Sequence, residues 1–229
     1  MNKVNILSRI MLRNGEISDE RSSDGISWTS SNIPISTSIF YPKAIHKFSL
    51  DFSNCPDYNG GYYVVSNNDF AVGSNNYSIG MWVKENRRVG SWRSILGPYG
   101  GNYFTIWQID RYVAGPALTW GSGDWNSGPN SISDGQWHSV VFSRAKGTVR
   151  LFVDGKLNTS GWIGEGTVIN TSNLRIGNGY DNAPFNGWIS DFTISTAAIE
   201  EEFDLKKLKE YFPLSVSVTY DNFEVGDLK

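Results

Sequence analysis

The sequence predicts an all-β sandwich, and three observations point to that fold class. Aromatic residues make up 14% of the 229-residue chain, charged residues only 19%, and 24 positions are glycine. Short runs of alternating apolar and polar residues, separated by turns rich in Gly, Asn and Ser, recur from residue 48 to residue 195. About a dozen such runs indicate a large antiparallel sandwich rather than a βαβ fold.

The strongest strand signal is the stretch DGQWHSVVFSRAKGTVRLFVDG at residues 134–155. It contains the runs Gln136–Ala145 and Thr148–Val153, and an Asp-Gly pair at each end favours a tight turn. Val140 and Phe142 share one face of the first run, as the period of two in a half-buried strand requires. We expect these runs to be central strands of a sheet.

The opposite face of this hairpin is not purely polar, because it carries Trp137, Val141 and Phe152. Something must therefore cover this face or bind to it, and we expect Trp137 and Phe152 to line a concave surface. His138 falls on the face of Val140, and we expect it to be buried and hydrogen-bonded rather than bound to a metal.

The remaining strands are expected at shorter runs of the same kind. They are Phe48–Phe52, Tyr62–Val65, Tyr77–Lys84, Ser94–Gly97, Tyr103–Ile109, Ala117–Trp120, Asn173–Gly177 and Phe185–Ser195. A single short C-terminal helix is predicted over residues 197–212. Thr196 would cap it, acidic residues come early and lysines late, and Pro213 would end it.

Composition and charge argue against nucleic-acid binding and membrane insertion. A net charge of −3 provides no field for nucleic acid, and no apolar run approaches the roughly 20 residues that span a bilayer. The N-terminus lacks the apolar core and cleavage site of a secretory signal, so we expect synthesis in the cytoplasm without a signal peptide. Cys55 is the one cysteine, and no disulfide framework can form within the chain.

The order of the motifs now indicates a family. The segments SLDF, YVV, YSIGMWVK, SISDGQWHSVVFSR, TVRLFVDGK, NLRIGNG and PFNGWISDFTIS occur in this order between residues 46 and 203. This order resembles the laminin-G-like, concanavalin A-like lectin-glucanase jelly-roll domains. The resemblance implies two antiparallel sheets, one of them concave, with carbohydrate or protein ligands at the concave face or its rim loops. Some members of the family bind calcium, and some relatives are glycoside hydrolases.

The resemblance divides the chain into three parts. Residues 46–203 would form the jelly roll, and residues 204–229 the C-terminal helix and tail. Residues 1–45 would be an N-terminal arm with one or two short strands, serving either as an extra layer on the main domain or as an anchor on another chain. Other structural proteins would then bind through residues 1–45 and 213–229.

Sugar binding has the best support from composition. Aromatic rings stack on the apolar face of a sugar, while amides, carboxylates and guanidinium groups bind its hydroxyls. A Gly-rich loop with two tryptophans, the turn before it and a second aromatic–polar loop supply such groups. The candidate residues are Trp120, Asp124, Trp125, Asn126, Arg111, Tyr180 and Asn182. The alternative is that these tryptophans fill the ends of the sandwich.

Calcium binding and glycoside hydrolysis have weaker support from the sequence. The resemblance implies that Asp57 and Asp191 could meet at one rim and bind calcium, although ordinary turn acids are the favoured interpretation. Hydrolysis needs two facing carboxylates, and the Glu-x-Asp-x-x-Glu strand of the glucanase relatives is missing from this sequence. We therefore expect no enzyme.

The function that we expect is a non-catalytic, lectin-like module whose partner is a glycan or a glycosylated surface. A lectin-like domain without an export signal suggests a phage particle, so we expect a virion surface component in decoration, fibre or tail, which could be a homo-oligomer. The alternative is a purely structural assembly protein that uses the jelly roll as a scaffold. A glycoside hydrolase is the least favoured function.

Overall fold

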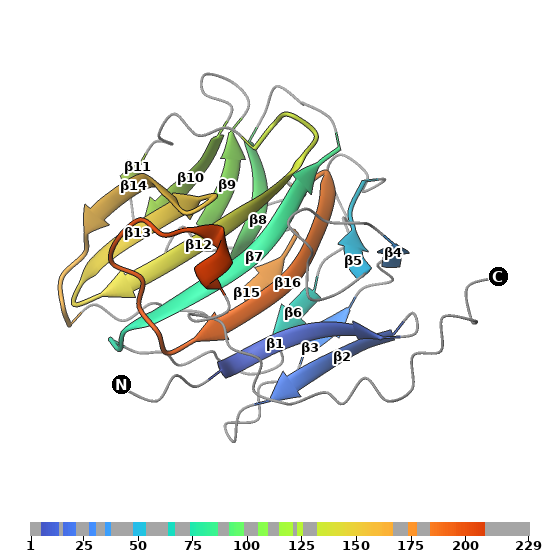
Figure 1. Cartoon of the computed structure of the whole chain (residues 1–229), viewed down its shortest axis with the longest axis horizontal. Coiled ribbons are helices and arrows are strands. Elements are labelled where there is room, and N and C mark those ends of the chain that lie inside the picture. Colours follow the sequence, from blue (N-terminus) through green and yellow to red (C-terminus); the bar gives the residue numbers. More distant parts are fainter. Residues whose placement is uncertain are drawn as a thin grey trace.

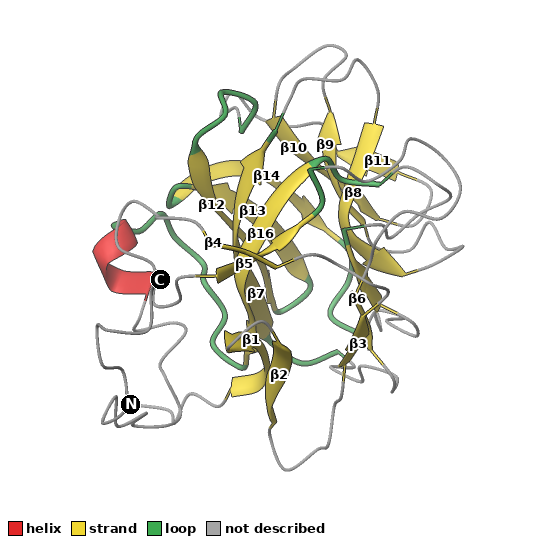
Figure 2. Ribbon diagram, turned by 90° about the vertical axis from the view of Figure 1, so that its right-hand side faces the viewer, coloured by secondary structure: helices red, strands yellow, loops and turns green. Residues whose placement is uncertain are grey.

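The computed structural model of the chain consists of two antiparallel β-sheets packed face to face, as Figure 2 shows from the side. The structure describes backbone and side chains for residues 49–53, 74–86, 93–97, 132–166, 175–177 and 184–208, and the backbone alone for the remaining strand residues. Almost all of the regular structure is strand, which confirms the predicted all-β jelly-roll sandwich.

One sheet, here called sheet A, has nine strands in the described part of the chain. Its continuous order is β14 (Lys156–Trp162), β13 (Thr148–Val153), β12 (Trp137–Ala145), β7 (Tyr77–Glu85), β16 (Gly187–Ser195), β1 (Ile6–Arg13) and β2 (Glu16–Arg21), with β5 (Phe48–Asp51) beside β16 and β4 (Ile35–Thr37) beside β5. Figure 1 looks onto its outer face. Strand β14 therefore forms one edge of this sheet.

The second sheet, here called sheet B, has seven strands in the described part. Its order is β11 (Gly123–Trp125), β10 (Gly115–Trp120), β9 (Thr105–Ile109), β8 (Trp92–Pro98), β15 (Leu174–Ile176), β6 (Val64–Ser66) and β3 (Trp28–Ser30). Strand β11 is an edge of sheet B, and it lies against β14, the edge of sheet A. Two sheet edges therefore meet at this end of the sandwich.

The core lies between the sheets and follows the predicted alternation. Val140 pairs with Met81 and Phe142 with Ile79 across β12 and β7, and all four side chains are buried. Other buried apolar residues of sheet A include Val149, Leu151, Val153, Ile189, Phe192 and Ile194, and those outside it include Ile95, Ile132, Ile176 and Phe185. Burial of these side chains is the main stabilising contribution to the fold.

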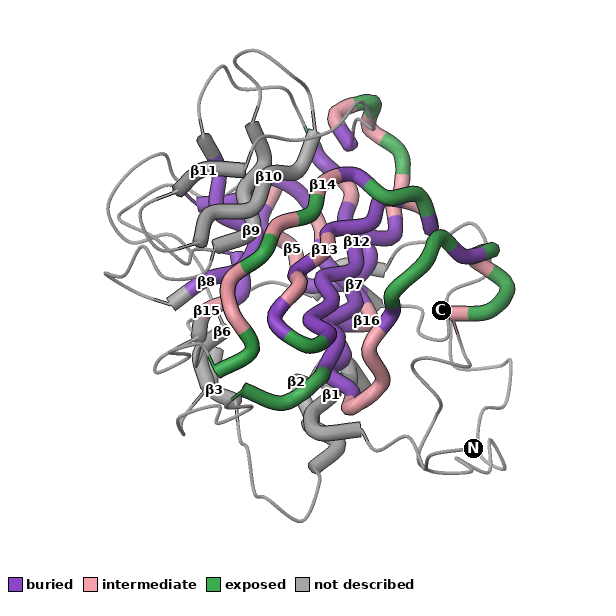
Figure 3. The backbone as a smooth tube through the Cα atoms, turned by 90° about the vertical axis from the view of Figure 1, so that its left-hand side faces the viewer, coloured by how far each residue is buried: buried purple, intermediate pink, exposed green. Residues whose placement is uncertain are grey.

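Residues 196–208 cross the outer face of sheet A as a segment that we call the strap. Ile199 and Phe203 of the strap pack on Val141 of β12 and Phe152 of β13. Figure 2 shows the short helix of the strap on the side of sheet A that faces away from sheet B, and Figure 3 shows the buried strands beneath. Phe152 is only 1% exposed, so its predicted place on an open concave surface is wrong.

The strap also corrects the predicted helix over residues 197–212. Residues 197–204 are not helical, and the described helix is one 3₁₀ turn, η1 (Leu205–Lys207), capped by Asp204 instead of Thr196. The backbone amide of Ile199 donates to Ser143 Oγ at 2.7 Å and that of Phe203 to the Gly155 carbonyl at 2.9 Å. These bonds to the sheet satisfy two backbone amides that would otherwise donate to carbonyl groups within a helix. Among the described helices, none is long and apolar enough to span a bilayer.

Residues 1–45 contribute four strands, more than the one or two expected. Strand β1 pairs with β16, β3 with β6 and β4 with β5, so this segment extends both sheets. Docking of this segment on another chain stays a prediction.

Candidate functional site

The most exposed large apolar side chain in the described part of the chain is Trp162, the last residue of the edge strand β14. Its side chain is 62% exposed, compared with 40% for Leu157 on the same strand. Trp162 pairs with Thr148 of β13, whereas Val149 and Leu151 of β13 point into the core. Trp162 therefore lies on the outer face of sheet A, where a large apolar ring in water marks a candidate interaction site.

Arg150 lies beside this tryptophan on the same face. It pairs with Ser143 of β12 and with Ser160 of β14, and Ser160 is exposed. Arg150 is partly buried, and its Nη1 atom is buried with no hydrogen-bond partner. Because Trp162 and Arg150 are diagonal neighbours across β13 and β14, both can reach one ligand. We name Trp162, Arg150, Ser160 and Thr148 the edge patch.

Part of the predicted sugar site lies on strands that contact β14. Trp120, Asp124 and Trp125 do not lie in a loop: they belong to a hairpin in which β10 returns directly as β11. Trp120 pairs with Gly123, and Trp125 with Leu118. Both β10 and β11 lie against β14. Since directly opposed residues share a face, the register places the two tryptophans on one face of the hairpin and Asp124 on the other.

The other predicted site residues give a mixed result. Arg111, Asn126, Tyr180, Asn182 and Asp57 lie outside the described residues. Asp191 lies in β16 with φ +52°, between Ser190 and Thr193 where the register with β7 shifts. In the described part of the chain, no group of three or more His, Cys, Asp or Glu side chains is placed to hold a metal ion. The calcium site at Asp57 and Asp191 stays a prediction.

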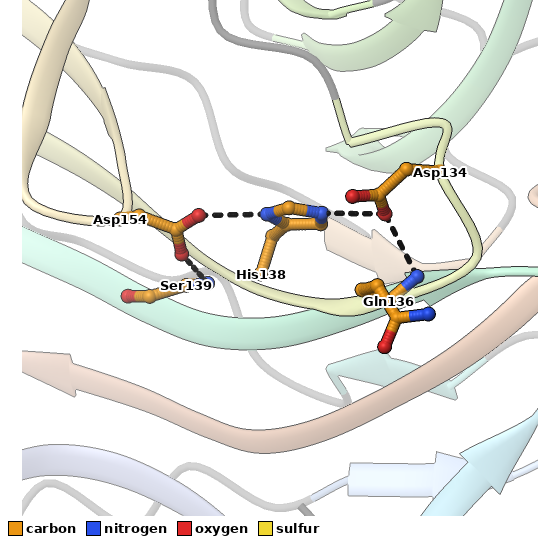
Figure 4. Close-up of polar contacts among 5 residues, drawn as sticks. All are labelled: Asp134, Gln136, His138, Ser139 and Asp154. Atoms are coloured by element: carbon orange, nitrogen blue, oxygen red, sulfur yellow. Dashed lines mark hydrogen bonds and ion pairs between the residues drawn. The ribbon is translucent and has the colours of Figure 1, made fainter. Parts of the chain in front are cut away.

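A second polar cluster surrounds His138 at the start of β12 (Figure 4). Nδ1 of the ring lies 2.7 Å from Asp154 Oδ2, and Nε2 lies 2.8 Å from Asp134 Oδ1. The backbone amides of Ser139 and Gln136 donate to the same two carboxylates, each at 2.8 Å. We call this arrangement the His138 clamp, and it confirms the prediction of a hydrogen-bonded histidine.

The two carboxylates set the charge of the ring. Burial of the ring lowers the pKa of His138, but hydrogen bonds and attraction to Asp154 and Asp134 outweigh burial and raise the pKa above 6.5. Partial burial raises the pKa of Asp134, while bonds from His138 and the Gln136 amide outweigh burial and lower it below 3.8. Both ring nitrogens have partners, so the ring joins two turns and is not a free acid or base.

The clamp fixes the turn between β13 and β14. Asp154 adopts φ +50°, in the left-handed region that a non-glycine residue occupies only when its surroundings hold it there. Its side chain is bound by His138, and its amide donates to the Ser139 carbonyl at 2.9 Å. The next residue, Gly155, accepts from Phe203 of the strap. The start of β14 is therefore held by His138 through Asp154 and by the strap through Gly155.

A family model supports the resemblance found in the sequence motifs. The model is described as the concanavalin A-like lectin/glucanases superfamily, and it matches residues 57–202. The chain belongs to this superfamily. No curated protein sequence matches the chain significantly.

Solved structures with the same fold come from an arabinanase and from toxins. Domain 4 of AbnA, a GH43 extracellular arabinanase from Geobacillus stearothermophilus, in complex with arabinotriose, is 19% identical with a TM-score of 0.63; the match covers 87% of this chain and 96% of that domain. The binding domain of Paraclostridial Mosquitocidal Protein 1 is 14% identical with a TM-score of 0.64, over 86% of this chain and 50% of that one. The binding domain of Botulinum neurotoxin DC in complex with rat synaptotagmin II is 16% identical with a TM-score of 0.63, over 90% and 51%. The chain thus spans about half of the toxin binding domains, and these likenesses show the fold.

Trp162 and Arg150 were not predicted as site residues from the sequence. Strand β14 has the sequence KLNTSGW, which lacks the alternation used to predict the other strands. A signal was present nonetheless, because the Asp154-Gly155 turn implies a returning strand. A regular hairpin through that turn would place Trp162 opposite Gly147, and only the register shift between Leu151 and Phe152, which the sequence does not indicate, moves it opposite Thr148 on the outer face.

Proposed function

We propose that this domain is a non-catalytic carbohydrate-binding module and that the glycan contacts the edge patch and the adjoining β10–β11 hairpin. The observation that carries the proposal is Trp162, which is 62% exposed at the end of β14. A tryptophan ring offers a flat apolar surface to the C–H groups of a sugar ring. Ser160 and Arg150, on the same face, supply hydrogen-bonding groups for sugar hydroxyls.

The superfamily and its structural relatives support this proposal. Lectins and glucanases are the named members of the superfamily, and domain 4 of the arabinanase was solved with a trisaccharide. Binding without hydrolysis is favoured because hydrolysis requires two carboxylates across the scissile bond, about 5–9 Å apart. None of the four residues of the edge patch is acidic.

The test is a glycan array probed with the full chain, followed by calorimetry on the best ligand. The Trp162→Ala variant should bind that ligand about 30-fold more weakly, because truncating a central aromatic contact costs about 2 kcal/mol. Leu157→Ala is the matched control, since Leu157 is also exposed on β14 but lies at the other end of the strand. A wild-type chain that binds no glycan would refute the function.

The same ligand separates the predicted site from the edge patch. Trp120→Ala and Trp125→Ala should each weaken binding if the glycan extends onto the hairpin. If these two variants lose binding while Trp162→Ala binds as the wild type does, the ligand lies on the hairpin alone and the edge patch is not its site.

A structural role in an assembly is the second candidate. Strand β2 forms the edge of sheet A opposite β14 in the described part of the chain, and an edge strand can pair with another chain. Light scattering over a range of concentrations tests this role, and a strict monomer would count against self-assembly. A place on a phage particle stays a prediction, which mass spectrometry of purified particles would test.

A further inference from the structure

The charge of Arg150 has no counterpart in the described part of the chain. Its strand neighbours on the outer face are Ser143 and Ser160, which are neutral. The Nη1 atom is buried without an acceptor, and no carboxylate forms an ion pair with the side chain. The free protein therefore carries an unpaired cation at this position.

The acids of the strap do not neutralise it. Glu202 is bound to Lys156 Nζ at 3.0 Å and to the Leu157 amide at 3.1 Å, at the other end of β14. Glu200 and Glu201 are exposed and form no ion pair with Arg150. An unpaired, partly buried cation gains more from an incoming anion than an exposed one does, because less water competes for it.

We propose that the edge patch selects a sugar residue that carries a carboxylate, as a uronic or sialic acid does. The inference depends on the proposed function, since it names the class of glycan for that site. The planar guanidinium of Arg150 would pair with the carboxylate, and the ring of Trp162 would stack on the same or the next sugar. Ser160 and Thr148 lie opposite these two residues and offer hydroxyl groups to the remaining oxygens.

A single carboxylate is a better match than a polyanion. The edge patch holds one cation, and Lys156, at the other end of β14, is already bound to Glu202. The chain carries a net charge of −3, which opposes the approach of a densely charged polymer. A guanidinium also matches the geometry of a carboxylate with two parallel hydrogen bonds.

The experiment compares probes that differ only in charge. An oligogalacturonide and its methyl ester have the same sugar rings, and so do sialyllactose and the methyl ester of its sialic acid. Calorimetry on the full chain should show at least tenfold tighter binding of the acidic member of one of these pairs. Arg150→Gln should weaken binding of the acidic member much more than that of the neutral member and so remove the preference, and Arg150→Lys should restore part of it.

The controls separate this inference from the proposed function. Lys156→Gln removes a cation from the adjacent strand β14 and should keep the preference, whereas Trp162→Ala should weaken binding of both members of the pair. Equal affinity of the wild type for both members, or a preference that survives in Arg150→Gln, would overturn the inference and leave glycan binding intact. Failure of the wild type to bind any probe or array glycan would overturn the proposed function itself. Thermal unfolding of each variant confirms that it is folded.

Discussion

Replacing His138 by glutamine should destabilise the domain in a pH-dependent manner. The substitution removes a cation that joins Asp134 and Asp154. A hydrogen bond to a charged group contributes about 1.5–3 kcal/mol when shielded from water. Here the carboxylate side chains are 53% and 37% exposed, so we discount each bond to about 1 kcal/mol. The expected loss is therefore about 2 kcal/mol, or roughly 4–8 °C in Tm for a domain of this size.

The direction of the pH dependence follows from the two pKa shifts. The pKa of His138 is raised above 6.5, so its contribution is fully present below that pH and is lost as pH rises through the folded-state pKa. The pKa of Asp134 is lowered below 3.8, so its contribution is present above that pH and is lost as pH falls. The difference in unfolding free energy between wild type and variant should be largest between these limits.

Urea denaturation at a series of pH values measures this difference directly. Groups that titrate elsewhere in the protein cancel between wild type and His138→Gln. Gln136→Ala is the matched control, because only the backbone amide of Gln136 bonds to Asp134 and its side chain is exposed. A difference that stays constant from about pH 5 to about pH 9, or that grows with pH, would refute the assignment of a charged, clamped imidazole.

Three further predictions concern the strap. Phe203→Ala removes a ring that lies 5.7 Å from the Phe152 ring centre and should lower Tm by about 6–12 °C, from about 3 kcal/mol of lost packing. Gly155→Ala adds a methyl group against the Phe203 carbonyl at φ +79°, so it should speed tryptic cleavage at Lys206 and Lys207; cleavage at the wild-type rate would mean that the strap does not rest on this turn. Glu202→Gln removes an exposed ion pair with Lys156 and should leave Tm unchanged in differential scanning fluorimetry, whereas a loss as large as that of Phe203→Ala would show that charge, not packing, holds the strap.

The sandwich itself was predictable because the local sequence pattern of each central strand indicates which of its faces is buried. Val140 and Phe142 share one face with the period of two, and Asp-Gly pairs mark the turns at both ends of the hairpin. The strap was not predictable in this way. Ile199 and Phe203 are four residues apart, a spacing typical of one face of a helix. Contacts with distant parts of the chain, namely Val141 and Phe152, favour a mostly non-helical path instead.

The candidate site depends even more on distant contacts. The sequence predicts sugar contacts at Trp120 and Trp125, because glycines and polar residues separate them. Trp162 becomes notable only when β14 is known to be an edge strand, and Arg150 only when no acid is found beside it. Exposure of an aromatic ring and the absence of an ion pair are properties of the folded surface, which local sequence patterns do not encode.

The clamp and the strap together explain how an edge strand with two exposed apolar side chains keeps its register. Among the described strands of sheet A, β14 pairs with β13 alone, so its position depends on the turn from which it begins. Asp154 holds that turn through His138, and Gly155 and the Leu157 amide hold it through the strap. These attachments lie at the start of β14, while Trp162 ends the strand at the far side. The molecule therefore fixes the edge strand at one end and presents the tryptophan to solvent at the other, as a rigid binding surface requires.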